Sequence, residues 1–319
     1  MPCEPRALLR RILLVTDLLT LLGLSIVLAA VTYFVSTYPV AFQKAMALTS
    51  TPLQDPDWES GGALDVRRFV NSIPFRGSER VNLVRPSQLF EACIKQGRGN
   101  CANKSRALSW YLVGNDIPLQ RVDLLPIDGF LEGKGHTIVR TRYTLDGEVR
   151  VGIVDLLEGA LPTLRDVPID LPEFRGAPPF ACGLLKLSPR VDDASDYYGS
   201  YLETVVIGAV EGEQIARYLQ YLERWHVDVG LPTYERVVFA AWAIVIGIFP
   251  ETHVTPEQYD MLYRTAPWIF RTAYTLTWTV RVLLVLLPLA FVLHAWNWLS
   301  RRRTASAAKD RPASTPAAA

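Results

Sequence analysis

The chain has 319 residues, and its 33 basic and 32 acidic residues give a formal net charge of +1. Such a balance offers no broad positive surface for a nucleic acid, so we expect no nucleic-acid partner. The glycine-rich stretch Gly97-Arg98-Gly99 lacks the Lys-Ser/Thr ending and the preceding strand of a phosphate-binding loop, so no nucleotide cofactor is expected.

The first predicted element is a membrane span over Ile12 to Val35, an apolar run interrupted by Asp17 and a few hydroxyl residues. It exceeds the roughly 20 residues that a bilayer core requires. It is also too long for the apolar part of a secretory signal, so it is predicted to be an uncleaved signal anchor behind a cytoplasmic segment, 1–11. Residues 36–62 are expected to form a linker, because Thr51 to Gly62 is rich in Pro, Ser, Asp and Gly.

Residues 63–235 are expected to form one extracytoplasmic domain with an α+β core. A helix over Ser87 to Lys95 would place Cys93 on an apolar face, which indicates core packing. After a glycine-rich loop, Cys101 to Leu112 is predicted to form a helix with Asn100 as its N-cap and a left-handed stop at Gly114. Cys101 would then lie in the first turn, where the helix dipole favours a thiolate.

Two strands are predicted next, from His136 to Thr144 and from Glu148 to Asp155. The pair Asp146-Gly147 between them is typical of a tight hairpin turn. Pro-rich crossing segments are expected from Val167 to Ser188.

The hairpin turn fixes the register of these strands. If Asp146-Gly147 forms a two-residue turn, Leu145 faces Glu148 and Ile138 faces Asp155. Residues two apart on a strand share a face, so His136 and Asp155 become diagonal neighbours, about 7–8 Å apart at the backbone and within side-chain reach. A three-residue loop would place the two side chains on opposite faces.

Four segments together resemble a known family. They are Gly99-Asn100-Cys101 before a helix, Gly114 to Arg121 leading into a strand, Gly135-His136, and a strand ending in Val154-Asp155. In this order they resemble the core of the transglutaminase-like branch of papain-fold cysteine enzymes. The resemblance implies a helix packed on an antiparallel sheet, flanked here by N- and C-terminal transmembrane helices.

The resemblance also implies roles for three residues. Cys101 would be the nucleophile, His136 the general base and Asp155 the residue that orients the imidazole. Members of the family cleave or transfer acyl groups of amides through a thioester, and some are inactive. This chain has Thr137-Ile138 where many relatives have a small residue and Trp, and Leu156 where many have Pro.

Several plainer interpretations remain open for these residues. Cys101 is alternatively an inert core residue or a disulfide partner of Cys93, and Asp155 a strand-end cap. Gln96 is better interpreted as a solvated helix-end residue than as an oxyanion donor. Cys182 lies in an apolar stretch, and Cys3 lacks the context of a lipidated cysteine. The histidines are scattered at 136, 226, 253 and 294, so neither a metal nor another cofactor is expected.

The C-terminal part contains more apolar segments. Val210 to Val227 is predicted to be an amphipathic helix that buries Ile215, Tyr218, Leu219 and Leu222. Residues 236–281 are expected to form membrane-proximal helices. Within them, Val237 to Phe249 would rise only about 20 Å as a helix, which favours a buried or interfacial helix over a third span. Val282 to Leu299 is the second predicted span, followed by a disordered basic tail, 300–319.

Arginines set the expected orientation of the chain in the membrane. Arg6, Arg10 and Arg11 precede the first span, and Arg301-Arg302-Arg303 follow the second. The positive-inside rule then places both termini in the cytoplasm and the domain outside, which suggests a bacterial inner-membrane protein with a periplasmic domain.

The leading hypothesis is therefore a membrane-anchored cysteine enzyme that acts on a peptide or another amide. The alternative is a catalytically inactive papain-like module that assembles in a membrane complex through residues 237–249 and 282–299. An N-acyltransferase with the same triad is a third possibility.

Overall fold

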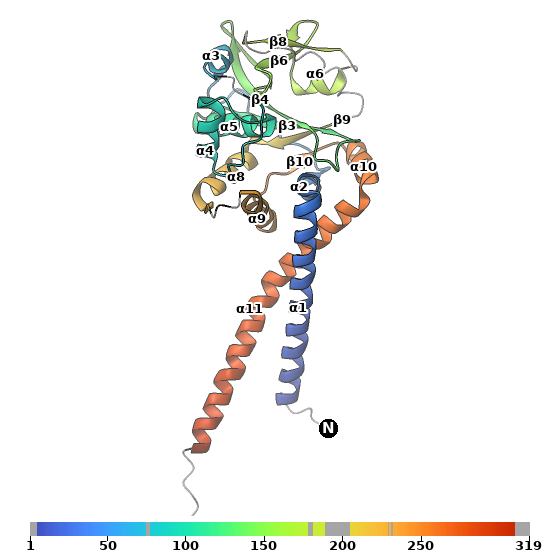
Figure 1. The fold of residues 1–319 in the computed structure, drawn as a ribbon, viewed down its shortest axis with the longest axis vertical. Helices are drawn as coiled ribbons and strands as arrows, with labels where there is room; N and C mark the ends of the chain where they lie inside the picture. The colour runs from blue at the N-terminus through green and yellow to red at the C-terminus, as the bar shows by residue number, and fades with distance from the viewer. Residues whose placement is uncertain are drawn as a thin grey trace, which may run out of the picture. The chain divides into compact units, whose positions relative to one another are not determined.

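The computed structural model describes residues 5–74, 77–177, 181–188, 205–228, 230 and 232–309. The chain divides into two compact units, one made of residues 1–33 with 274–319 and the other of residues 34–273. Helices and β-sheets are both present, so the α+β class is confirmed (Figure 1). Cys3, which the sequence indicates is not lipidated, lies outside the described residues.

The first unit consists of parts of two long helices, α1 (Pro5–Thr37) and α11 (Pro267–Lys309). Both are long and apolar enough to cross a membrane, over Arg11–Ala30 and Pro267–Leu299. The second helix begins earlier than predicted, because Pro267 starts it and no break separates residues 267–281 from the apolar run. The segment expected as separate membrane-proximal helices, 236–281, is therefore partly the beginning of α11.

Two contacts join α1 and α11 within this unit. Nε2 of His294 lies 2.9 Å from Oδ1 of Asp17, which pairs the charged residue of the first apolar run with a histidine of the second. A Cβ added to Gly23 would lie 2.8 Å from Cδ2 of Leu283, so the helices approach closely there. Small residues and polar pairs of this kind are common where membrane helices pack.

The second unit is built on a seven-stranded sheet in the order β1-β10-β9-β3-β4-β2, with β5 also paired to β4. The pairs formed among β9, β3, β4 and β5 are antiparallel, whereas β1 with β10 and β2 with β4 are parallel. The strands are β1 (Leu48–Thr49), β2 (Leu64–Asp65), β3 (Leu119–Pro126), β4 (His136–Leu145), β5 (Glu148–Val154), β9 (Val205–Glu211) and β10 (Thr252–His253).

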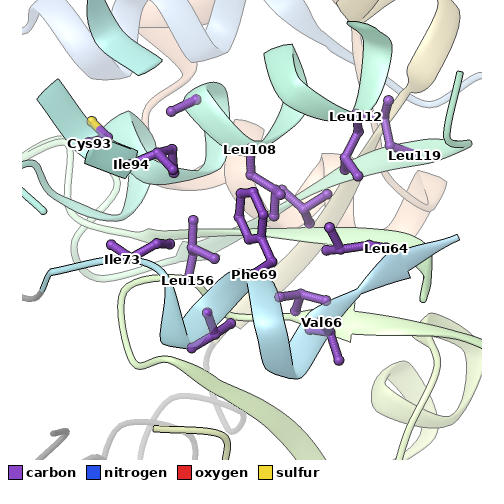
Figure 2. Close-up of a cluster of buried hydrophobic side chains, with 14 of the residues drawn as sticks. Leu64, Val66, Phe69, Ile73, Cys93, Ile94, Leu108, Leu112, Leu119 and Leu156 are labelled. Carbon is purple, nitrogen blue, oxygen red and sulfur yellow. The ribbon is translucent and has the colours of Figure 1, made fainter. Parts of the chain in front are cut away.

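One face of this sheet is covered by helices. They are α3 (Val66–Asn71), α4 (Pro86–Phe90), the π-helical turn η1 (Glu91–Lys95), α5 (Cys101–Gly114) and α8 (Gly212–Trp225). Their apolar residues form one cluster with Val139 and Val210 of the sheet. Figure 2 shows part of it, with Leu108 and Leu112 of α5 beside Phe69 of α3.

The opposite face carries a second, three-stranded sheet in the order β7-β6-β8, together with helix α6 (Leu171–Gly176). Its strands are β6 (Ala160–Leu164), β7 (Val167–Pro168) and β8 (Cys182–Lys186). Phe174 and Cys182 pack there against Ile138 and Val122, which alternate along β4 and β3 with the residues of the helical face. The sequence indicated only crossing segments from Val167 to Ser188, so this sheet was not foreseen.

The expected linker, 36–62, differs from the prediction. It contains helix α2 (Pro39–Ala47) and strand β1, and β1 pairs with β10 at the sheet edge. Its irregular part is also tied down, because Asp55 accepts hydrogen bonds from Gln120 and Arg140 at 2.9 and 2.8 Å. The composition rich in Pro and Gly therefore indicates irregular backbone in this segment, but the segment is packed against the domain and is not a flexible linker.

The amphipathic helix after β9 is confirmed as α8, and the four residues predicted to face the core are buried. Helix α9 (Pro232–Val245) packs against it through Ala243 and Phe239, and α9 is not among the helices long and apolar enough to span a membrane. His226 at the end of α8 bonds to Glu235 of α9 at 2.8 Å, with both side chains buried. Helix α10 (Pro256–Thr265) follows β10.

Candidate functional site

The site begins at the N-terminus of α5. The side chain of Asn100 accepts a hydrogen bond from the backbone N–H of Asn103 at 3.0 Å, and the side chain of Asn103 reaches back to the Asn100 N–H. This reciprocal cap confirms Asn100 as the N-cap and places Cys101 at the first helical position. The thiol therefore lies where the backbone N–H groups of the first turn have no partner within the helix.

The turn before Cys101 depends on a glycine. Gly99 has a φ of +103°, and a Cβ added to it would lie 2.8 Å from the sulfur of Cys93 and 2.9 Å from Cβ of Asn103. Only glycine meets both demands without strain. The far end of α5 differs from the prediction, because the helix ends at Gly114 as expected but the left-handed residue is Asp116, with a φ of 52°.

The predicted hairpin is confirmed by the pairing of β4 with β5. Leu145 pairs with Glu148, and the register continues to Val139 with Val154. Asp146 and Gly147 have φ values of 51° and 89°, as a two-residue hairpin turn requires.

This register brings His136 and Asp155 together. Nε2 of His136 lies 2.6 Å from Oδ2 of Asp155, and both side chains are fully buried. The other carboxylate oxygen, Oδ1, accepts hydrogen bonds from the backbone N–H groups of Leu157 and Glu158 at 3.0 and 3.2 Å. The carboxylate is thus held at both oxygens and fixes the plane of the imidazole ring.

Cys101 completes the cluster from the helix side. Its thiol lies 3.9 Å from the carbonyl oxygen of Gly135, and it is close enough to His136 for the imidazole to lower the pKa of the thiol. The Cys101 side chain is half-buried, whereas its partners are sealed from solvent.

The charges of this cluster favour an ion pair. Burial opposes ionisation of the Cys101 thiol, but the hydrogen bond and charge of His136 hold its pKa below the ordinary 9.0. Burial also opposes the charged form of His136, yet the Asp155 carboxylate raises the pKa of its imidazole to about 10. A thiolate beside an imidazolium is the reactive form of a cysteine nucleophile.

Further polar residues of α5 lie close to this cluster, and no sequence motif marks them. Ser105 donates to the backbone oxygen of Thr137 at 2.5 Å, which fastens the helix to β4 one turn after Cys101. Asn103 forms two hydrogen bonds with the backbone of Val81, at 2.9 and 3.0 Å. Lys104 is completely buried on the same helix. The sequence signal for these residues is the run of three polar side chains, Asn103, Lys104 and Ser105, in a helix that is otherwise expected to pack in the core.

The other described cysteines lie apart from this chemistry. Cys93 and Cys182 are buried, and neither is bonded to Cys101, so the disulfide alternative does not occur among the described residues. Burial raises the pKa of Cys93 to about 11, which keeps it a thiol. The side chain of Gln96 is exposed, in agreement with a solvated helix-end residue.

Comparisons of the chain with models of protein families, with curated proteins and with solved structures give no match.

Proposed function

We propose that this protein is a membrane-anchored cysteine enzyme that cleaves or transfers an amide-linked acyl group through a thioester on Cys101. The convergence of Cys101, His136 and Asp155 in one buried cluster carries this proposal. The three residues come from a helix N-terminus, a strand start and a strand end, so their meeting is a product of the tertiary fold.

The proposed reaction follows from the atoms in place. The Cys101 sulfur attacks the amide carbonyl and forms a C–S bond, while the C–N bond breaks and the His136 imidazolium gives its proton to the departing amine. Neutral His136 then takes a proton from water or from an acceptor amine, which attacks the thioester and releases the thiolate. The N–H groups at the start of α5 stabilise the oxyanion in both steps.

The fold supports placing this core with the papain-like, transglutaminase-like enzymes. A helix with the cysteine in its first turn packs on antiparallel strands that carry the histidine and the aspartate, in the chain order of that family. The two candidate spans and the flanking arginines support an inner-membrane protein whose domain faces the periplasm.

The direct test is labelling of the full chain with a thiol-directed acyl probe. Cys101→Ala is expected to abolish labelling, whereas Cys93→Ala and Cys182→Ala keep it because those thiols are buried. Equal labelling of the three variants would contradict the assignment. A membrane-impermeant form of the probe, applied to intact spheroplasts, tests the orientation, since only a periplasmic Cys101 would react before lysis.

Complementation separates an enzyme from an inactive assembly module. A strain that lacks the protein and shows a measurable defect is supplied with the wild-type chain or with Cys101→Ala. Rescue by the wild type alone supports catalysis. Equal rescue by Cys101→Ala would show that the chain acts as a binding module.

A further inference from the structure

A cavity of about 150 Å³ lies beside the catalytic cluster, within the second unit. It is enclosed by α2, α5, α8, the central strands β3 and β4, and the segment before β10. Four cationic side chains line it, each from a different part of the chain: Lys44 from α2, Arg80 from the loop before α4, Arg106 from α5 and Arg121 from β3.

Negative charge in this cavity is scarce. Asp123 is the one carboxylate among its lining residues. It already bonds to Arg121 at 3.0 Å and accepts from Thr137 at 3.1 Å. Burial favours the neutral form of Asp123, but Arg121 and Lys44 keep its pKa below the ordinary value. The cavity therefore carries an excess of positive charge.

These cationic side chains have N–H groups that can donate further hydrogen bonds. Nε of Arg121 is buried and has no hydrogen-bond partner in the described part of the chain. Lys44, Arg80 and Arg106 form no ion pair with any described carboxylate. Burial lowers the pKa of Lys44 and of Arg106, which reflects the cost of holding these charges away from water. An anion in the cavity would offset that cost.

The cavity lies next to the first turn of α5, which carries Cys101. Ala102, the residue after Cys101, lines it, and Arg106 lies one turn further along α5. A Cβ added to Gly135 would lie 3.0 Å from Nζ of Lys44, and the carbonyl oxygen of Gly135 is the one that faces the thiol. Lys44 thus lines the cavity and also approaches the residue whose carbonyl oxygen faces the thiol.

We propose that this cavity binds an oxyanionic group, a carboxylate or a phosphate, of the substrate whose amide Cys101 attacks. The inference rests on the proposed function and names its substrate class: an acyl donor with an acidic group close to the scissile amide. Guanidinium groups suit such a ligand because their N–H donors match two oxygens at once. The cavity volume is large enough for several water molecules, and so for one such group in their place.

The first experiment compares alkylation of Cys101 by iodoacetate and by iodoacetamide in the full-length protein. The cavity attracts the anionic reagent, so the iodoacetate-to-iodoacetamide rate ratio of the wild type should exceed that of a free thiol such as glutathione. Arg106→Gln or Lys44→Gln is expected to lower the iodoacetate-to-iodoacetamide rate ratio about tenfold, the effect of one lost charge-assisted contact. Arg217→Gln is the control, because Arg217 is exposed on α8 and does not line the cavity.

The second experiment measures binding without catalysis. Inorganic phosphate and glutarate are added in turn to the Cys101→Ala variant, and the shift in thermal unfolding reports binding. At least one of them is expected to stabilise Cys101→Ala, and about tenfold more of it is needed once Arg106→Gln or Lys44→Gln is added. The anion that stabilises more strongly identifies the oxyanion class.

The two experiments separate this inference from the proposed function. Binding by Cys101→Ala that depends on Arg106 and Lys44 supports the cavity even if Cys101 proves unreactive toward amides. No stabilisation by either anion, or equal stabilisation of folded Arg106→Gln and Lys44→Gln variants, would overturn it. A wild-type iodoacetate-to-iodoacetamide rate ratio no higher than that of a free thiol such as glutathione would overturn it as well.

Discussion

The imidazole of His136 and the carboxylate of Asp155 meet at 2.6 Å in a place that water does not reach. Asp155 is fixed in turn by the backbone N–H groups of Leu157 and Glu158. Two functions follow from this arrangement. It fixes the orientation of the ring close to Cys101, and it stabilises a positive charge on the ring.

The first prediction concerns the carboxylate. Asp155→Asn keeps the size of the side chain but removes the charge that raises the pKa of His136. We expect acyl transfer to fall by about 10²- to 10⁴-fold, because the imidazolium loses its partner and the ring its orientation. The rate of acylation of Cys101 by an activated ester measures the effect, and unchanged thermal unfolding would show that the fold is intact.

A matched control is available for that substitution. Glu158→Gln removes a neighbouring carboxylate but keeps the hydrogen bond that the backbone N–H of residue 158 donates to Asp155. It should change the acylation rate by less than about tenfold, given the weak effect of a partly exposed charge. A loss as large as that of Asp155→Asn would contradict a specific role for Asp155.

The second prediction is the pH profile. The pKa of Cys101 is held below the ordinary 9.0, so alkylation by iodoacetamide should rise at a lower pH than it does for an ordinary thiol. The pKa of His136 is raised to about 10, so its proton, and the stabilising effect of the ion pair, should persist at neutral pH and be lost as pH rises through about 10. His136→Gln should move the alkylation curve to higher pH, toward that of an ordinary thiol.

The sign of the stability effect can be checked separately. Because the folded pKa of His136 lies above its ordinary 6.5, its contribution is complete below that value and declines toward pH about 10. Thermal unfolding of the wild type should therefore show a loss over this range that is absent in His136→Gln. An identical loss in both proteins would assign it to other groups.

The third prediction concerns the turn before Cys101. Gly99→Ala should destabilise the protein by about 2 kcal/mol or more, because a left-handed φ and a close approach to Cys93 both disfavour a Cβ. Gly114→Ala is the control, since nothing lies within 4 Å of its Cβ position and the residue is helical. It should leave stability unchanged or raise it by up to about 1 kcal/mol. Thermal unfolding of the full chain measures both.

The fourth prediction concerns the side chain that ties the two sheets together. Arg140 is buried and forms two hydrogen bonds to Asp170 at 2.6 and 2.5 Å, and others to Asp55 and Gln120 at 2.8 and 2.9 Å. Arg140→Leu should lower the free energy of unfolding by about 3–5 kcal/mol, because Asp170 and Asp55 lose the cation that pairs with them. Arg140→Lys should recover only part of this, since an ammonium does not form the paired contact.

Arg142, two residues further on β4, is the matched control. It bonds to the backbone oxygens of Glu59 and Gly61 at 2.9 and 3.1 Å, in exposed positions. Arg142→Leu should lower the free energy of unfolding by about 1 kcal/mol or less. Equal losses from Arg140→Leu and Arg142→Leu in chemical unfolding would argue against a special role for the buried network.

The features that could be predicted from the sequence are those that depend on neighbours along the chain. Asp146-Gly147 determined the turn, the turn determined the register, and the register brought His136 near Asp155. Asn100 likewise marked the start of α5. Each of these depends on local backbone geometry, which a few residues decide.

The features that could not be predicted depend on residues far apart in the chain. Lys44 lies in a segment whose composition predicts a linker, and Arg106 is one residue of a predicted helix. Their shared cavity forms only where residues of α2, α5 and α8 come together in the tertiary fold. The second sheet escaped prediction because β7 is two residues long and β6 contains Pro162, which disfavours a strand assignment. Hydrophobic periodicity is weak in elements this short.

Gly135 connects the two halves of the site, since its carbonyl oxygen faces the thiol and its missing side chain leaves room for Lys44. A Cβ there would also lie 2.7 Å from the backbone oxygen of Leu124, at a φ of +145°. A saturation library at this codon should therefore contain almost no functional survivors, although the residue neither reacts nor carries charge. Among natural sequences that share this fold, a glycine at this place should therefore mark those that keep the same arrangement of the thiol and Lys44.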